Sequence, residues 1–459
     1  MYCLLRSCFQ KCVHLIRKIK LKYVCICIGL VAVLDFFGVF THMFEITYDS
    51  NFVYPYEGDI HEFVNALRHN EKPVVDPIND YNFSFLIDNH EKCIETPRTT
   101  FRVVYIVKSA VEHFERRSAI RNSWGFEKRF FDVPSKTVFM LGISPSDEIQ
   151  AKVKVEAATY KDIIQANFID TYYNNTIKTM MSFKWLIKRC LNSKFYMFVD
   201  DDIYVSVKNV LRFIRNPTNY PSYLKEPKKF EAHKREIKDS DIREEPYIND
   251  TVIQKNVHIL NKHDLPMYNN LKEKITAEKI IHGSEEKSLY NSLNTISSII
   301  TNFTEKDRDS NKTMMNEPFR VKRQIFDFEL PEDVRLFAGF VFVSSPHRHK
   351  SSKWYVSLRE YPYHLWPPYV TAGAYILSKE ALLDMYYSSL YTKHFRFDDI
   401  YLGLVAKKAN IEPFHCEEFH FYKKDYTKFN YKYVVTSHGY GNPNELLNVW
   451  NEQKTLGNA

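Results

Sequence analysis

Three consecutive aspartates, Asp200, Asp201 and Asp202, interrupt the apolar run FYMFVDDDIYVSV. The apolar residues on both sides predict a buried β-strand that ends at the carboxylates. Adjacent carboxylates repel one another and lose hydration when they are buried, so a cation or solvent must compensate. Oxygen ligands of this kind suit Mn²⁺ or Mg²⁺. The run therefore predicts a metal site that neutralises a departing diphosphate, with a solvated acidic turn as the alternative.

A second acidic pair, Asp398 and Asp399, lies in FRFDDIYLGLVAKKANI at the start of a helix-like run. Carboxylates in the first turn of a helix often do no more than stabilise its N-terminus. The functional interpretation makes one of them a general base, which takes the proton from an acceptor hydroxyl as that hydroxyl attacks a sugar. An α-linked donor would then give a β-linked product.

The block RRSAIRNSWG places Arg117 and Arg121 four residues apart on one face of a predicted helix, with Trp124 close by. Two guanidinium groups on one face are suited to gripping a diphosphate. A surface face that pairs with Asp or Glu elsewhere in the chain is an equal alternative.

These groups need a scaffold, and the hydrophobic pattern predicts one. FRVVYIVKSA from Phe101 and KTVFMLGIS ending at Gly142 predict buried strands, separated by a helix through 116–124. YVTAGAYILS predicts another strand, and KEALLDMYYSSL an amphipathic helix. Strands that alternate with helices favour an α/β fold with a mixed, mostly parallel central sheet.

The catalytic domain is expected in two halves, 99–225 and 327–459. Between them, residues 226–326 are crowded with Lys, Glu, Asn, Asp and Ser. Such a composition buries little apolar surface, so we expect a low-complexity, disordered insertion.

The N-terminal region predicts a membrane anchor. Residues 23–44 (YVCICIGLVAVLDFFGVFTHMF) are apolar over a length that crosses a bilayer core of about 30 Å as a helix. Basic residues precede the run and acidic residues follow it, which places 1–22 in the cytosol and the remainder in the lumen. Residues 45–98 are expected to form a stem. The alternative, a cleaved signal peptide, fits poorly with so long an apolar run.

Features of the luminal part agree with passage through the secretory pathway. Three cysteines lie there, Cys93, Cys190 and Cys416, which allows one disulfide and one remaining thiol. Lys+Arg (63) nearly balance Asp+Glu (56), and the net charge of +7 predicts no nucleic-acid partner. N-glycosylation sequons begin at Asn82, Asn174, Asn249, Asn302 and Asn311.

Taken together, the motifs resemble the β1,3-glycosyltransferases of the galactosyltransferase and N-acetylglucosaminyltransferase family (family 31). RSAIRNSW, FMLG, YKDIIQANFIDTYYNNTIKT, DDD and DDIYLG occur in the order of that family's motifs. The stretches FVDDDIYVS, LFAGFVF, SSKWYVSLREYPYHLWPPYVTAGAYILS and FRFDDIYLGLVAKKA are similar to an insect branch that elongates glycosphingolipids. The stem and residues 226–326 have no counterpart in the resemblance.

This resemblance implies an inverting, metal-dependent enzyme with a GT-A-type nucleotide-sugar-binding fold, held in the Golgi membrane as a single-pass type II protein. UDP-GlcNAc or UDP-Gal would be the donor, and a glycolipid or glycoprotein glycan the acceptor. The implied residues are Asp399, with Asp398 beside it, as catalytic base; Asp200, Asp202 and His438 as ligands of Mn²⁺ or Mg²⁺; Asp200, Asp201, Arg117, Arg121 and Trp124 at the donor; and Trp366, Tyr369 and Gly373 along the acceptor and donor sugar.

Two other classes of protein would use the same scaffold. The first is a catalytically silent, glycan-binding or chaperone-like membrane glycoprotein, and the second is a metal-dependent nucleotide-sugar hydrolase. The two intact acidic motifs argue against a purely binding role.

Overall fold

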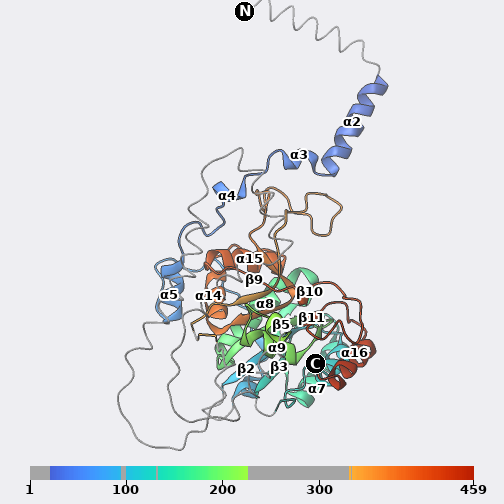
Figure 1. The fold of residues 1–459 in the computed structure, drawn as a ribbon. Helices are drawn as coiled ribbons and strands as arrows, with labels where there is room; N and C mark the ends of the chain where they lie inside the picture. Colours follow the sequence, from blue (N-terminus) through green and yellow to red (C-terminus); the bar gives the residue numbers. More distant parts are fainter. Residues whose placement is uncertain (1–20, 95–99, 131–132, 226–329, 332) are drawn as a thin grey trace, which may run out of the picture. The chain divides into compact units, whose positions relative to one another are not determined.

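The computed structural model describes residues 21–94, 100–130, 133–225, 330–331 and 333–459 (Figure 1). The described residues all belong to one compact unit. Residues 226–326 lie outside the described residues, so the disorder expected for them and the sequons at Asn249, Asn302 and Asn311 stay predictions.

This unit is built on an eight-stranded mixed sheet with the order β1-β4-β3-β2-β5-β8-β7-β9. The four neighbouring strands β4, β3, β2 and β5 run parallel, whereas β8 is antiparallel to both β5 and β7. This confirms the predicted α/β class and the mostly parallel sheet. The strands are β1 (Phe85–Ile87), β2 (Phe101–Lys108), β3 (Ser135–Ile143), β4 (Ile163–Ile169), β5 (Ser193–Asp200), β7 (Phe337–Phe342), β8 (Tyr369–Ser378) and β9 (Phe414–His415).

A second, smaller sheet has three strands in the order β10-β11-β6. It consists of β6 (Tyr204–Val205), β10 (Phe419–His420) and β11 (Thr436–Ser437). β6 follows directly on the aspartate run and pairs antiparallel with β11. This pairing brings the turn at 201–203 next to the segment after β11, where His438 lies.

Helices cover both faces of the large sheet, because its central strands are apolar on both faces. Along β2, Val104 and Ile106 belong to one core, whereas Val103, Tyr105 and Val107 belong to the other. The first core also takes residues from α8 (Asn175–Arg189), α14 (Lys379–Ser389) and α15 (Asp398–Lys408). The second takes residues from α6 (Phe114–Arg121), α7 (Asp147–Tyr160), α9 (Val207–Arg215) and α16 (Pro443–Thr455).

The predicted membrane-spanning helix over 23–44 is not found. Helix α2 (Leu21–Phe36) ends inside that run, and α3 (Val39–His42) begins after Gly38. Gly38 has a φ of 79°, a left-handed conformation that interrupts a regular helix. Across the parts of the chain that the structure describes, no helix combines the length and the apolar character needed to cross a bilayer.

The predicted stem is not a free spacer over its described residues. Ile46 forms a β-bridge with Tyr363, and Arg68 of α5 (His61–Arg68) forms ion pairs with Glu380 and Asp384 of α14. The scattered aromatic residues of this segment pack into the first core, which explains why they lack helical or strand periodicity.

A disulfide joins Cys93, at the end of this segment, to Cys190 at the end of α8, with a Cα–Cα distance of 5.3 Å. The prediction of one disulfide and one remaining thiol is confirmed, and the remaining thiol is the buried Cys416.

Candidate active site

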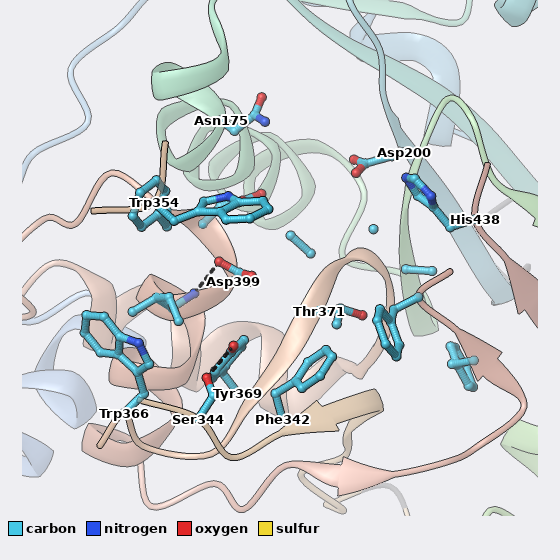
Figure 2. Close-up of a pocket in the computed structure, with 18 of the residues that line it drawn as sticks. Asn175, Asp200, Phe342, Ser344, Trp354, Trp366, Tyr369, Thr371, Asp399 and His438 are labelled. Carbon is cyan, nitrogen blue, oxygen red and sulfur yellow. Dashed lines mark hydrogen bonds between the residues drawn. The ribbon is translucent and has the colours of Figure 1, made fainter. Parts of the chain in front are cut away.

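A cavity of about 470 Å³ opens where β5 ends and β8 begins, at the edge of the sheet where the parallel strands have their carboxyl ends. Open α/β sheets generally bind ligands at this edge. Figure 2 shows Asp200 and His438 on one side of the cavity, and Asp399 beside Trp354 on the other. Asp200 and Asp399, which are 199 positions apart in the sequence, thus line one cavity.

Asp200 is the last residue of β5 and lies next to Lys108, the last residue of β2, in the sheet register. Lys108 Nζ is 3.1 Å from Asp200 Oδ1, and only 3 % of the lysine side chain is exposed. Burial raises the pKa of Asp200 to about 7, although the Lys108 ammonium opposes the shift. Asp200 lines the cavity, and one of its two oxygens is already paired with Lys108.

Lys108 also contacts the second acidic motif. Its Nζ donates to Asp398 Oδ2 at 2.8 Å, and Thr179 Oγ1 lies 3.4 Å from the same oxygen. Burial alone would lower the pKa of Lys108, but the carboxylates of Asp200 and Asp398 outweigh burial and raise it. A buried ammonium thus links the end of β5 to the start of α15, and it holds Asp398 as its partner.

Asp201 points away from the cavity into a cluster of donors. Its Oδ2 accepts from Ser109 Oγ at 2.7 Å and lies 2.7 Å from His113 Nδ1, and its Oδ1 accepts from Arg116 Nη1 at 2.9 Å. Burial opposes ionisation, but the hydrogen bonds from His113 and Ser109 prevail and lower the pKa of Asp201. Both of its oxygens are occupied within the protein and Asp201 does not line the cavity, so its predicted role at the donor stays a prediction.

Asp202 and His438 form the accessible pair of the aspartate run. His438 Nε2 lies 3.4 Å from Asp202 Oδ2, and the two side chains are 43 % and 26 % exposed. The backbone carbonyl of Asp202 accepts from Tyr440 N–H at 2.7 Å, which fixes the turn.

This pair fits part of the predicted metal site. A carboxylate and an imidazole suit Mn²⁺, and a nucleotide-binding site takes further ligands from phosphate and water. Over the described ranges, however, no three His, Cys, Asp or Glu side chains form a ready metal cluster. Asp200, the third predicted ligand, is instead paired with Lys108.

Asp399 lies in the first turn of α15, where the chain enters the helix from Phe397 in an extended conformation. Its Oδ1 accepts from the backbone N–H of Ile400 at 2.8 Å. Burial, followed by the charge of Asp398, raises the pKa of Asp399 to about 7, against the weaker effects of the Ile400 hydrogen bond and Lys108. A cavity-lining carboxylate with this pKa is suited to accept a proton near neutral pH.

All three predicted sugar-contact residues line the cavity. Tyr369 Oη lies 2.9 Å from Ser344 Oγ, and its ring stacks on Phe342. Trp366 is only 4 % exposed and its ring centroid lies 4.0 Å from that of Tyr361, so most of the indole belongs to the core. A Cβ at Gly373 would lie 3.9 Å from both Asp200 Oδ2 and His438 Cδ2. The missing side chain keeps the space between these two groups open.

The arginines of α6 require a correction. Arg117 is fully buried and donates to Glu156, with Nη2–Oε2 at 2.8 Å. Arg121 pairs with Asp162 and Glu156, each at 2.7 Å, and Trp124 is 1 % exposed. None of the three lines the cavity, so the alternative of pairing with carboxylates describes the structure. The pairs are buried rather than on the surface.

Sequence reasoning missed several residues of the site. Lys108 carried a usable signal, because a charge at the carboxyl end of a buried parallel strand points to the ligand-binding edge of the sheet. His113 and Arg116, which hold Asp201, stand just before Arg117 and Arg121 in the sequence. Tyr172 and Trp354 carried no such signal, since they are 182 residues apart and meet only through folding.

Two of the predicted glycosylation sites fall within the described residues. Asn82 is exposed, whereas Asn174 is partly buried and donates from Nδ2 to the carbonyl of Ile169 at 2.7 Å. Asn174 directly precedes α8 and the cavity-lining Asn175.

Known proteins are similar in sequence to this chain over most of its length. Residues 115–248 and 325–417 match the family model described as galactosyltransferase. The chain is 31 % identical over 444 residues to beta-1,3-galactosyltransferase brn of Drosophila melanogaster. The matched region covers 96 % of this chain and 98 % of the Drosophila protein. This chain is 23 % identical over 379 residues to beta-1,3-galactosyltransferase 1 of Homo sapiens, with 83 % and 81 % covered. These matches confirm the resemblance inferred from the motifs: the chain belongs to the galactosyltransferase family.

Proposed function

We propose that this protein is an inverting β1,3-hexosyltransferase that moves galactose or N-acetylglucosamine from a UDP-sugar to a glycan acceptor. The observation that carries the proposal is the placing of Asp399 across one cavity from Asp200 and His438. A proton acceptor on one wall and a polar, metal-compatible group on the other are what in-line displacement at a sugar carbon requires. The names of the relatives support the β1,3 linkage.

In the proposed reaction the 3-hydroxyl of the acceptor lies against Asp399. The hydroxyl oxygen attacks the anomeric carbon of the α-linked donor, and its proton passes to the Asp399 carboxylate. The bond between the anomeric carbon and the phosphate oxygen breaks, and UDP leaves with the electron pair. Because attack comes from the face opposite UDP, the product carries a β linkage.

The opposite wall would receive the nucleotide diphosphate. Asp202 and His438 would hold Mn²⁺ or Mg²⁺, which when bound neutralises the charge of the leaving UDP. Lys108 keeps Asp200 and Asp398 in place through its two short contacts. It thereby ties the end of β5 to the start of α15, the helix that carries the base.

The proposed acceptor is a glycolipid of the mannosyl-glucosyl-ceramide type. The proposed location of the chain is the Golgi membrane, with the catalytic unit in the lumen. The Cys93–Cys190 disulfide supports an oxidising compartment of the secretory pathway. Immunofluorescence of the tagged full chain with Golgi markers, and protease protection of its catalytic unit in sealed vesicles, would test the location.

A donor and acceptor screen tests the activity. The full-length protein with Mn²⁺ is offered UDP-Gal or UDP-GlcNAc together with mannosyl-glucosyl-ceramide or β-GlcNAc acceptors, and the products are identified by mass spectrometry and linkage analysis. We expect one donor to give a β1,3-linked product. The absence of transfer with every pair would favour a glycan-binding glycoprotein, and UDP release at full rate without acceptor would favour a hydrolase.

A further inference from the structure

Two aromatic side chains form a ledge at the mouth of the cavity. Trp354 Nε1 donates to Tyr172 Oη at 3.2 Å, and both residues line the cavity. Their exposed fractions are 44 % and 52 %, which is high for rings of this size. We call this pair, Tyr172 and Trp354, the aromatic ledge.

Neighbouring polar groups hold the ledge in position. Lys353 Nζ lies 4.4 Å from the centroid of the Trp354 ring and 5.7 Å from that of Tyr172. The ring of His347 lies 5.8 Å from that of Trp354. Arg396, just before α15, donates to the carbonyl of Tyr355 and pairs with Glu360. These contacts tie the segment that follows Trp354 to the start of α15. The ledge therefore has a defined orientation although much of its surface faces solvent.

The ledge lies on the side of the base and not on the side of the diphosphate. Figure 2 shows Trp354 next to Asp399, with Asp200 and His438 across the cavity. The charge of Asp399 also contributes to a raised pKa of Tyr172, after the larger effect of burial. If the accepting hydroxyl lies at Asp399, the rest of the acceptor must extend away from the departing UDP, toward this side.

We propose that the aromatic ledge binds the second sugar of the acceptor, the one to which the accepting sugar is attached. This inference rests on the proposed function. It makes the acceptor at least a disaccharide and makes Trp354 a determinant of acceptor specificity.

The chemistry of the ledge favours a sugar. A pyranose has one apolar C–H face, which stacks on an aromatic ring, and a rim of hydroxyls that need hydrogen-bond partners. The ledge offers an indole ring together with a phenol, an ammonium and an imidazole at its edge. A hydrocarbon chain would remove water from the ammonium of Lys353 and the imidazole of His347 without offering either a hydrogen bond, at a cost in free energy.

Acceptor kinetics of the full-length protein test the proposal. The acceptors are methyl β-mannoside and the methyl glycoside of mannosyl-β1,4-glucose. We expect the KM of the disaccharide to be about threefold to tenfold lower than that of the monosaccharide, because one sugar–aromatic contact contributes that much to binding. In Trp354→Ala the ratio of the two KM values should fall to near one, and Trp354→Tyr should restore most of it. Phe429→Ala is the matched control, because Phe429 is 86 % exposed and does not line the cavity.

Tryptophan fluorescence provides a readout that needs no turnover. All five tryptophans lie in the described part of the chain, and four of them are at most 4 % exposed, so quenching by acrylamide reports mainly on Trp354. We expect the disaccharide to reduce the quenching of the wild type more than the monosaccharide does. Trp354→Phe should lose both the quenching by acrylamide and the protection by the disaccharide.

The outcomes separate this inference from the proposed function. If the wild type transfers no sugar to any acceptor, the proposed function fails, and protection of Trp354 still decides the inference. An unchanged KM ratio in Trp354→Ala overturns the inference, as does the absence of protection by the disaccharide. Loss of a preference for octyl over methyl aglycones, with the sugar ratio intact, would assign the ledge to a hydrocarbon and also overturn it.

Discussion

Asp201 and Asp399 each stand second in a run of acidic residues beside the same cavity, yet their surroundings differ. Asp201 is 5 % exposed and receives hydrogen bonds from Ser109 and Arg116 beside His113, so its pKa lies below the usual range. Asp399 accepts one backbone hydrogen bond, and burial raises its pKa to about 7. Asp399 is only partly buried, so the number of donors around a carboxylate, rather than burial alone, separates a structural anion from a proton acceptor.

The largest expected effect tests this division at Asp399. Asp399→Asn keeps the shape of the side chain but cannot accept the proton, so kcat should fall by about a thousandfold or more. Thermal unfolding should stay close to that of the wild type, because the carboxylate has a single backbone donor. Asp147→Asn, on an exposed carboxylate of α7, is the control. A folded Asp399→Asn enzyme with wild-type turnover would refute the assignment of the base.

The accessible pair beside Asp201 should respond to metal. Treatment with a chelator should abolish transfer, and Mn²⁺ should restore it. Asp202→Ala and His438→Ala should each lower kcat/KM by about a hundredfold at limiting Mn²⁺, because either change removes a predicted ligand. Excess Mn²⁺ should recover part of the loss. Full activity of the chelated protein would contradict a metal at this end of the cavity.

The pH dependence sharpens the comparison further. Asp399 must be ionised to accept a proton, so kcat/KM should rise about tenfold per pH unit below a pH of about 7 and level off above it. Asp398→Asn removes a negative charge that raises the pKa of Asp399, so the rising limb should move to lower pH. A flat profile from about pH 5.5 to 8.5 in the wild type would not fit this base.

Asp201 should matter to folding rather than to proton transfer. Asp201→Asn leaves donors of the cluster without a charged acceptor, so the free energy of unfolding should fall by about 2 kcal/mol. Urea denaturation of Asp201→Asn beside Asp399→Asn measures the contrast. Equal stability of the two variants would show that the donor cluster does not distinguish them.

The smallest effect concerns how α15 places its carboxylates. A Cβ at Gly403 would lie 2.6 Å from the Cβ of Tyr369, so the glycine lets α15 approach β8 closely. Gly403→Ala should cost about 1–3 kcal/mol of stability and raise the KM for acceptor, because α15 must shift. Ala406→Gly is a control for a change of helix propensity in the same helix. Unchanged stability and KM would show that the contact relaxes without moving Asp399.

Much of the scaffold followed from local pattern. The stretch YVTAGAYILS predicted β8 residue for residue, and FRVVYIVKSA predicted β2 with two residues too many at its end. Continuous apolar runs of this length fit a strand buried on both faces. The N-terminal segment did not follow. Its isolated aromatic residues pack one at a time into the first core, for example Phe52 against Tyr363 and Phe63 against Tyr391, and such contacts leave no period in the sequence.

The sequence by itself determined the class of fold, the family and the two acidic motifs, since each of these depends on residues that are close together in the chain. Only the tertiary structure decided which arginine meets which carboxylate, that Lys108 links Asp200 to Asp398, and that Trp354 meets Tyr172. The physical reason is that proton affinity and ligand contact depend on groups brought together from distant parts of the chain, and local periodicity carries no record of them.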